Sequence, residues 1–208
     1  MKRNYVVLFL IFISWSVFSQ DEKTKQLLSS IEGKYLISDQ GDVVIQKIIK
    51  DSTKNKEVLY NTIKQSLITI YRNANSVIQI DDKEGGLIVC KGIFDDLLNA
   101  KGVQDGVFFT GHHLLKIEIK DGRARITIIL NNIERDVAAS QYAIRQHEEK
   151  HISQYYPFNN ERTGLFANTF KSQEGRMFYN LTKRSIGLLE NIEKSIMTST
   201  PTKTNDNW

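Results

Sequence analysis

Residues His113–Ile133 read HLLKIEIKDGRARITIILNNI, and this stretch decides the fold. Apolar and polar side chains alternate on both sides of Asp121-Gly122, a dipeptide typical of the type I′ turn that joins antiparallel strands. Pairing the strands about that turn brings apolar residues together on one face and opposite charges on the other: Ile119 with Ala124, Ile117 with Ile126, Leu115 with Ile128, and Glu118 with Arg125. One register satisfies turn, burial and charge, so the sequence predicts a hairpin with one buried face.

Two more pairs of β-rich runs and one helix precede this hairpin. Lys34–Ser38 and Val43–Lys50 are separated by Asp-Gln-Gly-Asp, and Ser76–Ile80 and Leu87–Phe94 by Asp-Asp-Lys-Glu-Gly-Gly. Both separators are rich in turn-forming residues, so each pair of runs is expected to form a hairpin. Between the two pairs, Lys54–Asn73 carries apolar residues at three- and four-residue steps, which predicts a helix.

The C-terminal third has the composition of helices. We expect helices over Val137–Ser153 and Gln173–Met197 and a disordered tail over Thr198–Trp208. The expected fold class is α+β: an antiparallel sheet of about five strands with one helix in its middle connection, followed by a helical C-terminal region. In residue numbers, the sheet domain spans 34–135, the helical region 136–197 and the tail 198–208.

The first nineteen residues are typical of an export signal. Lys2 and Arg3 precede a 14-residue, almost wholly apolar run, Tyr5–Phe18, which is short for a membrane span and fits the apolar region of a signal peptide. Val17 and Ser19 are small enough to permit cleavage before Gln20. The alternative is a short membrane anchor that stays. No cysteine follows the apolar run, so the expected product is periplasmic or extracellular and not a lipoprotein, with residues 20–33 as a linker.

Composition narrows the function classes. Hydrophobic residues make up 40% of the 208, enough for a packed core, and the single cysteine excludes a disulfide framework and a cysteine-rich zinc module. Because residues 1–19 contain two bases and no acid, their removal lowers the net charge from +4 to +2. A net charge of +2 is too small to indicate a nucleic-acid-binding protein. No stable membrane span is expected after cleavage.

Two motifs carry a resemblance to a known family. Ala74–Gly92 reads ANSVIQIDDKEGGLIVCKG, and Ile117–Ile128 reads IEIKDGRARITI. On these motifs, residues 35–134 resemble an uncharacterised domain of unknown function with a TBP-like fold, found in exported proteins of Bacteroidota-type bacteria. The resemblance implies a curved antiparallel sheet with helical cover. It implies no reaction, since fold does not carry function.

His147-Glu148-Glu149-Lys150-His151 matches the pattern H-E-x-x-H. On a helix, His147 and His151 would share a face and bind one zinc ion, and Glu148 would serve as the general base of a hydrolase. Against this, the charged residues between the histidines suit a solvated helix. A third ligand would have to be a downstream carboxylate such as Glu161 or Glu174, and nothing marks one. We therefore expect no zinc at this motif.

The other reactive residue types favour structural roles. His112 and His113 are adjacent in a strand and point to opposite faces, so they cannot easily share a metal. Cys90 lies in an apolar run and is expected to act as a small buried hydrophobe. Gly85-Gly86 suits a turn, and Gly92 inside a strand suggests a bulge or a close-packed crossing. The aromatic residues of the C-terminal third favour packing of helix on sheet.

These observations lead to a non-catalytic binding or structural module as the expected function, with an unknown protein or small-molecule partner. Its working surface would be the sheet face that the helices leave free, or the aromatic C-terminal region. A small zinc hydrolase using His147, Glu148 and His151 is the alternative. No catalytic, cofactor-binding or metal-binding residue is assigned, and no cofactor is expected.

Overall fold

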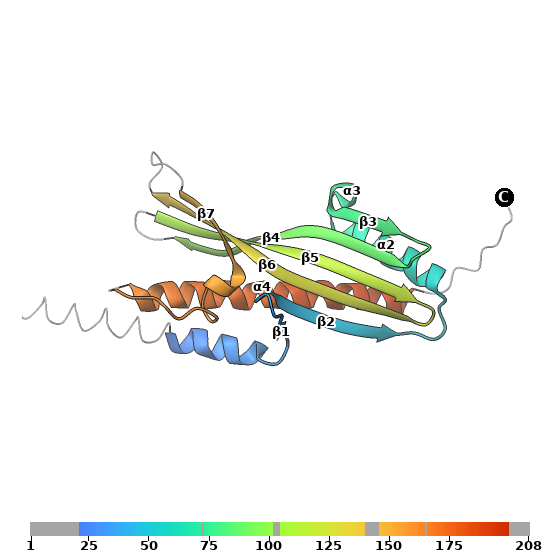
Figure 1. Cartoon of the computed structure of the whole chain (residues 1–208), viewed down its shortest axis with the longest axis horizontal. Helices are drawn as coiled ribbons and strands as arrows, with labels where there is room; N and C mark the ends of the chain where they lie inside the picture. The colour runs from blue at the N-terminus through green and yellow to red at the C-terminus, as the bar shows by residue number, and fades with distance from the viewer. Residues whose placement is uncertain (1–20, 72, 102–104, 140–145, 165, 200–208) are drawn as a thin grey trace, which may run out of the picture. The chain divides into compact units, whose positions relative to one another are not determined.

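The computed structural model describes residues 21–71, 73–101, 105–139, 146–164 and 166–199. Within these residues, seven strands form one sheet in the order β1-β2-β6-β5-β4-β3, and β7 pairs with β6 beside this path (Figure 1). The strands are β1 (Leu36–Ile37), β2 (Val43–Lys50), β3 (Ile78–Asp82), β4 (Leu87–Lys101), β5 (Asp105–Lys120), β6 (Arg123–Ala139) and β7 (Gln146–His151). The α+β class is confirmed, with two strands more than the expected five.

Three helices and one 3-10 turn accompany the sheet in the described part of the chain, besides a helical segment at residues 21–31. They are α2 (Lys56–Ile70), α3 (Ala74–Val77), η1 (Ile152–Gln154) and α4 (Ala167–Thr198). The expected helix in the middle connection is α2, and the long C-terminal helix is α4. Both are confirmed.

Contacts divide the chain into two compact units, and each unit is assembled from three separate segments. Unit 1 takes Met1–Val43, Phe94–Gly111 and Asn131–Lys183, whereas unit 2 takes Val44–Ile93, His112–Leu130 and Arg184–Trp208. Consequently β2, β4, β5, β6 and α4 each contribute residues to both units. The two units are described in turn.

The decisive hairpin lies in unit 2 and forms as expected. Gly122 has a φ of +69°, the left-handed conformation that its turn requires. The expected inward set, which includes Ile117, Ile119, Ala124, Ile126 and Ile128, is buried. On the opposite face, Arg125 donates two hydrogen bonds to the carboxylate of Glu118, at 2.8 and 2.7 Å.

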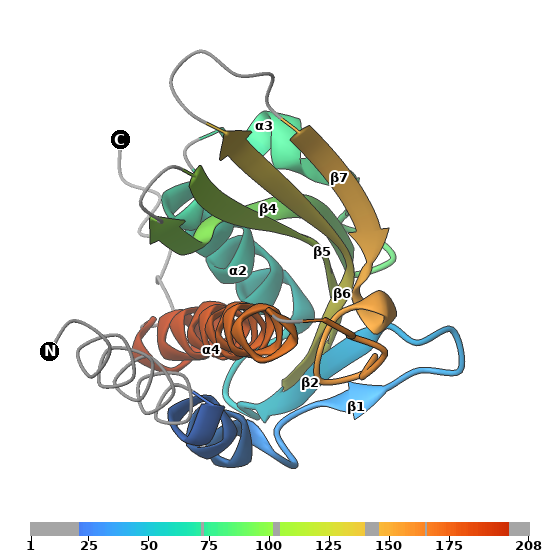
Figure 2. The ribbon, with the colours of Figure 1, turned by 90° about the vertical axis from the view of Figure 1, so that its left-hand side faces the viewer.

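Helical segments cover the inward face of this sheet in unit 2. Helix α2 begins after Asn55, whose side chain accepts a hydrogen bond from the Val58 backbone N–H at 2.9 Å. Its buried stripe includes Leu59, Ile63 and Leu67. The α4 residues of unit 2 contribute a second buried stripe, and they lie on the same side of the sheet as α2 (Figure 2).

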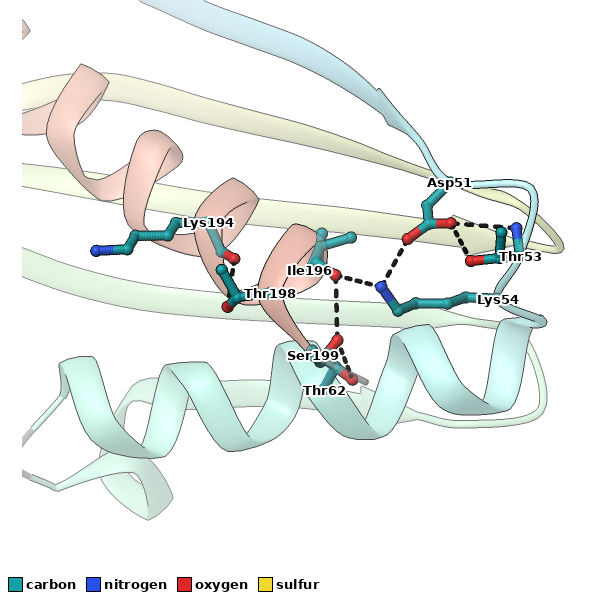
Figure 3. Close-up of polar contacts among 8 residues, drawn as sticks. All are labelled: Asp51, Thr53, Lys54, Thr62, Lys194, Ile196, Thr198 and Ser199. Carbon is teal, nitrogen blue, oxygen red and sulfur yellow. Dashed lines mark hydrogen bonds and ion pairs between the residues drawn. The ribbon is translucent and has the colours of Figure 1, made fainter. Parts of the chain in front are cut away.

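A buried lysine joins α4 to the turn between β2 and α2 in unit 2 (Figure 3). The Lys54 ammonium donates to the Asp51 carboxylate at 2.6 Å and to the Ile196 carbonyl at 2.5 Å. The Ser199 hydroxyl donates to the same carbonyl at 3.1 Å. A carbonyl near the end of α4, which lacks a helical N–H donor, thus receives two bonds.

The N-terminal segment of unit 1 differs from expectation. Residues 21–31 form a helix, although residues 20–33 were expected to be a linker. The segment is anchored, because Thr24 and Ile31 are buried and the hydroxyls of Thr24 and Ser172 share a hydrogen bond at 2.9 Å. Because this helix has few buried positions, its sequence shows only weak apolar periodicity, and the helix was not predicted.

The helix predicted over Val137–Ser153 is wrong. Strand β6 continues to Ala139, and β7 pairs with it antiparallel in a register that sets Asp136 opposite His147 and Arg135 opposite Glu148. The Arg135–Glu148 pair sets opposite charges directly across the ladder and favours this pairing, whereas the helical interpretation considered the segment alone. Residues 140–145 lie outside the described residues.

Two expectations about the ends of the chain fall on residues that the structure does not describe. The signal peptide at residues 1–19 lies there entirely, and the tail at residues 198–208 does so from residue 200. Among the helices that are described, none is both long and apolar enough to cross a membrane.

Candidate functional site

The two histidines of the H-E-x-x-H motif do not share a face of a helix, because β7 is a strand. Four residues along a strand span about 13 Å, far beyond what one zinc ion bridges. Each histidine also has its own partners. His147 Nδ1 lies 3.0 Å from Asp136 Oδ1, whereas His151 bonds Asp42 through Nε2 at 3.0 Å and Ser153 through Nδ1 at 2.8 Å.

The carboxylates of the hydrolase alternative, the proposed base Glu148 and the possible ligands Glu161 and Glu174, are engaged elsewhere or exposed. Glu174 is buried and accepts hydrogen bonds from Arg162 at 2.6 Å and from the Tyr156 backbone N–H at 2.9 Å. Glu148 pairs with Lys150, and Glu161 is exposed. Across the described ranges, no three His, Cys, Asp or Glu side chains are grouped so as to hold a metal ion. The hydrolase alternative therefore gains no support from the geometry.

His113 and Cys90 occupy the core of unit 2, as their positions in strands predict. His113 is buried, its Nε2 lies 2.9 Å from the Tyr71 hydroxyl, and burial lowers the pKa of its imidazole to about 4. Gly92 permits this placement, since a Cβ there would lie 2.5 Å from His113 Cε1. Cys90 is fully buried, and burial raises the pKa of its thiol to about 11. Neither group is poised for catalysis at neutral pH.

A groove of about 250 Å³ lies in unit 2 and is here called the basic groove. The side chains of Ile48, Glu118, Lys120, Arg123 and Arg125 line it. In β5 and β6 these residues alternate with the buried residues Ile117, Ile119, Ala124 and Ile126, so they belong to the sheet face that points away from α2.

The charge of the basic groove is unbalanced. Its single carboxylate, Glu118, is held by Arg125 and lies 3.4 Å from the Lys116 ammonium, and these partners lower the pKa of Glu118, the Arg125 hydrogen bond most. Lys120 and Arg123 form no ion pair with any residue that the structure describes. Ile48 adds an apolar side chain that is 53% exposed.

A second hollow, of about 150 Å³, lies wholly within unit 1 and is called the polar cavity. Its lining comes from β6, β7, the segment after η1, the following loop and the start of α4: Arg135, Glu148, Lys150, Tyr155, Arg162, Phe170 and Glu174. Sequence reasoning considered Glu148 and Glu174 only as parts of a zinc site and missed the rest. The one usable signal was the charge complementarity between Arg135 and Glu148 in an antiparallel register.

Comparison with protein families adds a name for the central part of the chain. Residues 46–134 match the model of a domain of unknown function (DUF4468) with a TBP-like fold. This match covers less than half of the chain. The resemblance drawn from Ala74–Gly92 and Ile117–Ile128 is thereby confirmed. The DUF4468 domain includes the β5–β6 residues of the basic groove and ends just before Arg135 of the polar cavity.

Two solved structures share the fold over more than the DUF4468 domain. A DUF4468 family protein from Bacteroides ovatus superposes with a TM-score of 0.57 at 12% identity, over 83% of this chain and 95% of that one. A TBP-like protein from Parabacteroides distasonis gives a TM-score of 0.57 at 14% identity, over 78% and 97%. No curated protein matches the chain. At these identities the likeness establishes the fold alone.

Proposed function

We propose that the protein is an exported, non-catalytic binding module whose basic groove takes an acidic segment of a partner protein. The observation that carries the proposal is the pair of cations, Lys120 and Arg123, that have no ion-pair partner in the described chain and stand beside an exposed Ile48. Export is supported by Lys2, Arg3 and the apolar run Tyr5–Phe18.

The positive charges of the basic groove favour a partner segment that carries carboxylates. Glu118 is already neutralised by Arg125, so an incoming segment meets the positive charges of Lys120 and Arg123. Lys116 and Lys50 alternate with buried neighbours and extend the same basic face. Carboxylates of the partner would form charge-assisted hydrogen bonds there, and complementary charge also raises the rate of encounter.

The form of the groove indicates how the segment is recognised. β5 and β6 have neighbouring strands on both sides in the sheet order, so their backbone groups offer no free edge for an added strand. Recognition would therefore use side chains on the face of the sheet. The exposed Ile48 would take one apolar side chain of the partner, an anchor flanked by charges.

The test measures binding of a labelled peptide by fluorescence anisotropy. The probe alternates Asp and Glu around a central Leu, and its control replaces every acid by the matching amide. We expect the acidic peptide to bind and the amide peptide to bind at least about tenfold more weakly, with an affinity that falls as salt is added.

Variants then locate the binding. Replacing both Lys120 and Arg123 by Gln should weaken binding by about tenfold or more, whereas the same charge change at Arg176 and Lys194, two exposed α4 residues, should not. Ile48→Ser should lower affinity without changing the salt dependence. Equal binding of both peptides, or binding of a sulfated polysaccharide alone, would overturn the proposal.

A further inference from the structure

The acidic side of the polar cavity is already satisfied. Glu174 is buried and accepts one hydrogen bond on each oxygen, from Arg162 and from the backbone N–H of Tyr156. Glu148 lies against the Lys150 ammonium, and this contact lowers the pKa of its carboxyl most, with Arg135 and Arg162 adding to the effect. Both carboxylates thus already have partners within the protein.

Arg135 has donors left over. Its only ion pair within the described chain is a 3.7 Å contact with Glu148 Oε2, which is too long for a hydrogen bond, and Lys150 pairs with the other oxygen of that carboxylate. A guanidinium offers five N–H donors in a planar fork that matches a carboxylate. The cavity holds three cations and two carboxylates, so one further negative charge would balance it.

Tyr155 supplies an unused hydroxyl. The residue is 1% exposed, its ring packs edge-on against Phe109 at 6.3 Å, and its hydroxyl has no hydrogen-bond partner within the described chain. Burial raises the pKa of this phenol well above its ordinary value, with Glu148 and Glu174 adding and the two arginines opposing. The group is therefore a neutral donor, and leaving it unpaired is costly.

Size and shape limit what can enter. A cavity of about 150 Å³ holds a molecule of roughly the size of benzene. Phe170, which is 39% exposed, gives the cavity one apolar wall. The hollow therefore matches a small ligand in volume.

We infer that the polar cavity binds a small monocarboxylate that carries a second oxygen, such as a short hydroxy or keto acid. Its carboxylate lies on the Arg135 guanidinium near Lys150, its hydroxyl or carbonyl oxygen accepts the hydrogen bond of Tyr155, and its carbon chain packs on Phe170. This site lies in unit 1 and is independent of the basic groove, which lies in unit 2.

The experiment titrates the whole mature protein with lactate, pyruvate and 3-hydroxybutyrate and follows backbone amide signals by NMR. We expect at least one acid to bind saturably with a dissociation constant in the range of about 1 mM, and its neutral amide to bind at least about tenfold more weakly. If no acid shifts signals of the cavity residues below about 50 mM, or if the amide binds equally, the inference is wrong.

Two variants distinguish a binding role from a structural one. Tyr155→Phe removes only the hydroxyl, so it should raise the thermal midpoint of the ligand-free protein while weakening the acid by about fivefold. Arg135→Met should weaken the acid by about tenfold or more, and Arg176→Met, at an exposed position of α4, should not. Unchanged affinity in both cavity variants would exclude this cavity as the site.

Discussion

In unit 2, the single residue Lys54 holds the turn between β2 and α2 against the end of α4. It is only 5% exposed, and burying an ammonium costs several kcal/mol unless partners replace water. Asp51 supplies the opposite charge, and the Ile196 carbonyl supplies an acceptor at the end of α4, where the helix dipole is negative. The lysine therefore links the turn between β2 and α2 to the end of α4, as Figure 3 shows.

The contact between Lys54 and Asp51 predicts that the stability of the folded protein depends on pH. Hydrogen bonds from Lys54, first, and from Thr53 lower the pKa of Asp51 from 3.8 to about 2 in the folded protein. A lowered folded-state pKa stabilises the protein above pH 4, and the contribution is lost as the pH falls from about 4 to about 2. Denaturant unfolding of wild type and Asp51→Asn should show a difference that is largest near neutral pH and vanishes near pH 2.

As a control, the same Asp51→Asn substitution is made in a Lys54→Met variant. Without the ammonium, the effect of Asp51→Asn should depend less on pH, because the main cause of the lowered pKa is gone. A pH-independent difference between wild type and Asp51→Asn would show that the pair does not form in solution.

Among the elements, the part of the β5–β6 hairpin within His113–Ile133 was predictable. Asp121-Gly122 fixes the turn and the alternation fixes the faces, so local sequence alone determines the register. Glu118 and Arg125 confirm it by two hydrogen bonds.

The hairpin can be tested with two neighbouring substitutions. Ile117→Asp puts an unpaired charge into the core and should lower the free energy of unfolding by about 3 kcal/mol or more. Lys116→Asp, on the outer face, should cost less than about 1 kcal/mol, even though Lys116 lies near Glu118. Both values come from denaturation midpoints, and equal losses would contradict the register.

Other elements depend on partners that are distant in the sequence. Gln146–His151 has no apolar periodicity, so its charged residues read as a solvated helix; only pairing with β6 makes it a strand. The same limit applies to the sites. Glu118, Lys120, Arg123 and Arg125 follow from the hairpin, but Ile48 joins them through pairing of β2 with β6. The polar cavity draws on several segments, which no local pattern brings together.

For the whole molecule, the fold extends further than the sequence family. The DUF4468 match ends at residue 134, yet the structural likeness to the Bacteroides ovatus protein covers 83% of the chain, which must include residues outside 46–134. Unit 2 itself needs such residues, because its core includes Leu188, Ile192 and Ile196 of α4.

The proposal of export predicts where the mature chain begins. Expressed in a bacterium with a Sec pathway, the protein should lose residues 1–19, and mass spectrometry should find Gln20 at the N-terminus. Ser19→Arg should block cleavage, since the position before the cut accepts only small residues, whereas Gln20→Arg should be tolerated. An intact Met1 on a membrane-bound product would favour the anchor alternative.

The interleaving of the two units has a genetic consequence. Each unit takes its residues from three stretches of the chain that are separated by stretches of the other. A gene fragment encoding residues 46–134 would produce the β5–β6 hairpin without the α4 residues that complete its unit. Recombination at a single crossover point can therefore transfer neither unit intact.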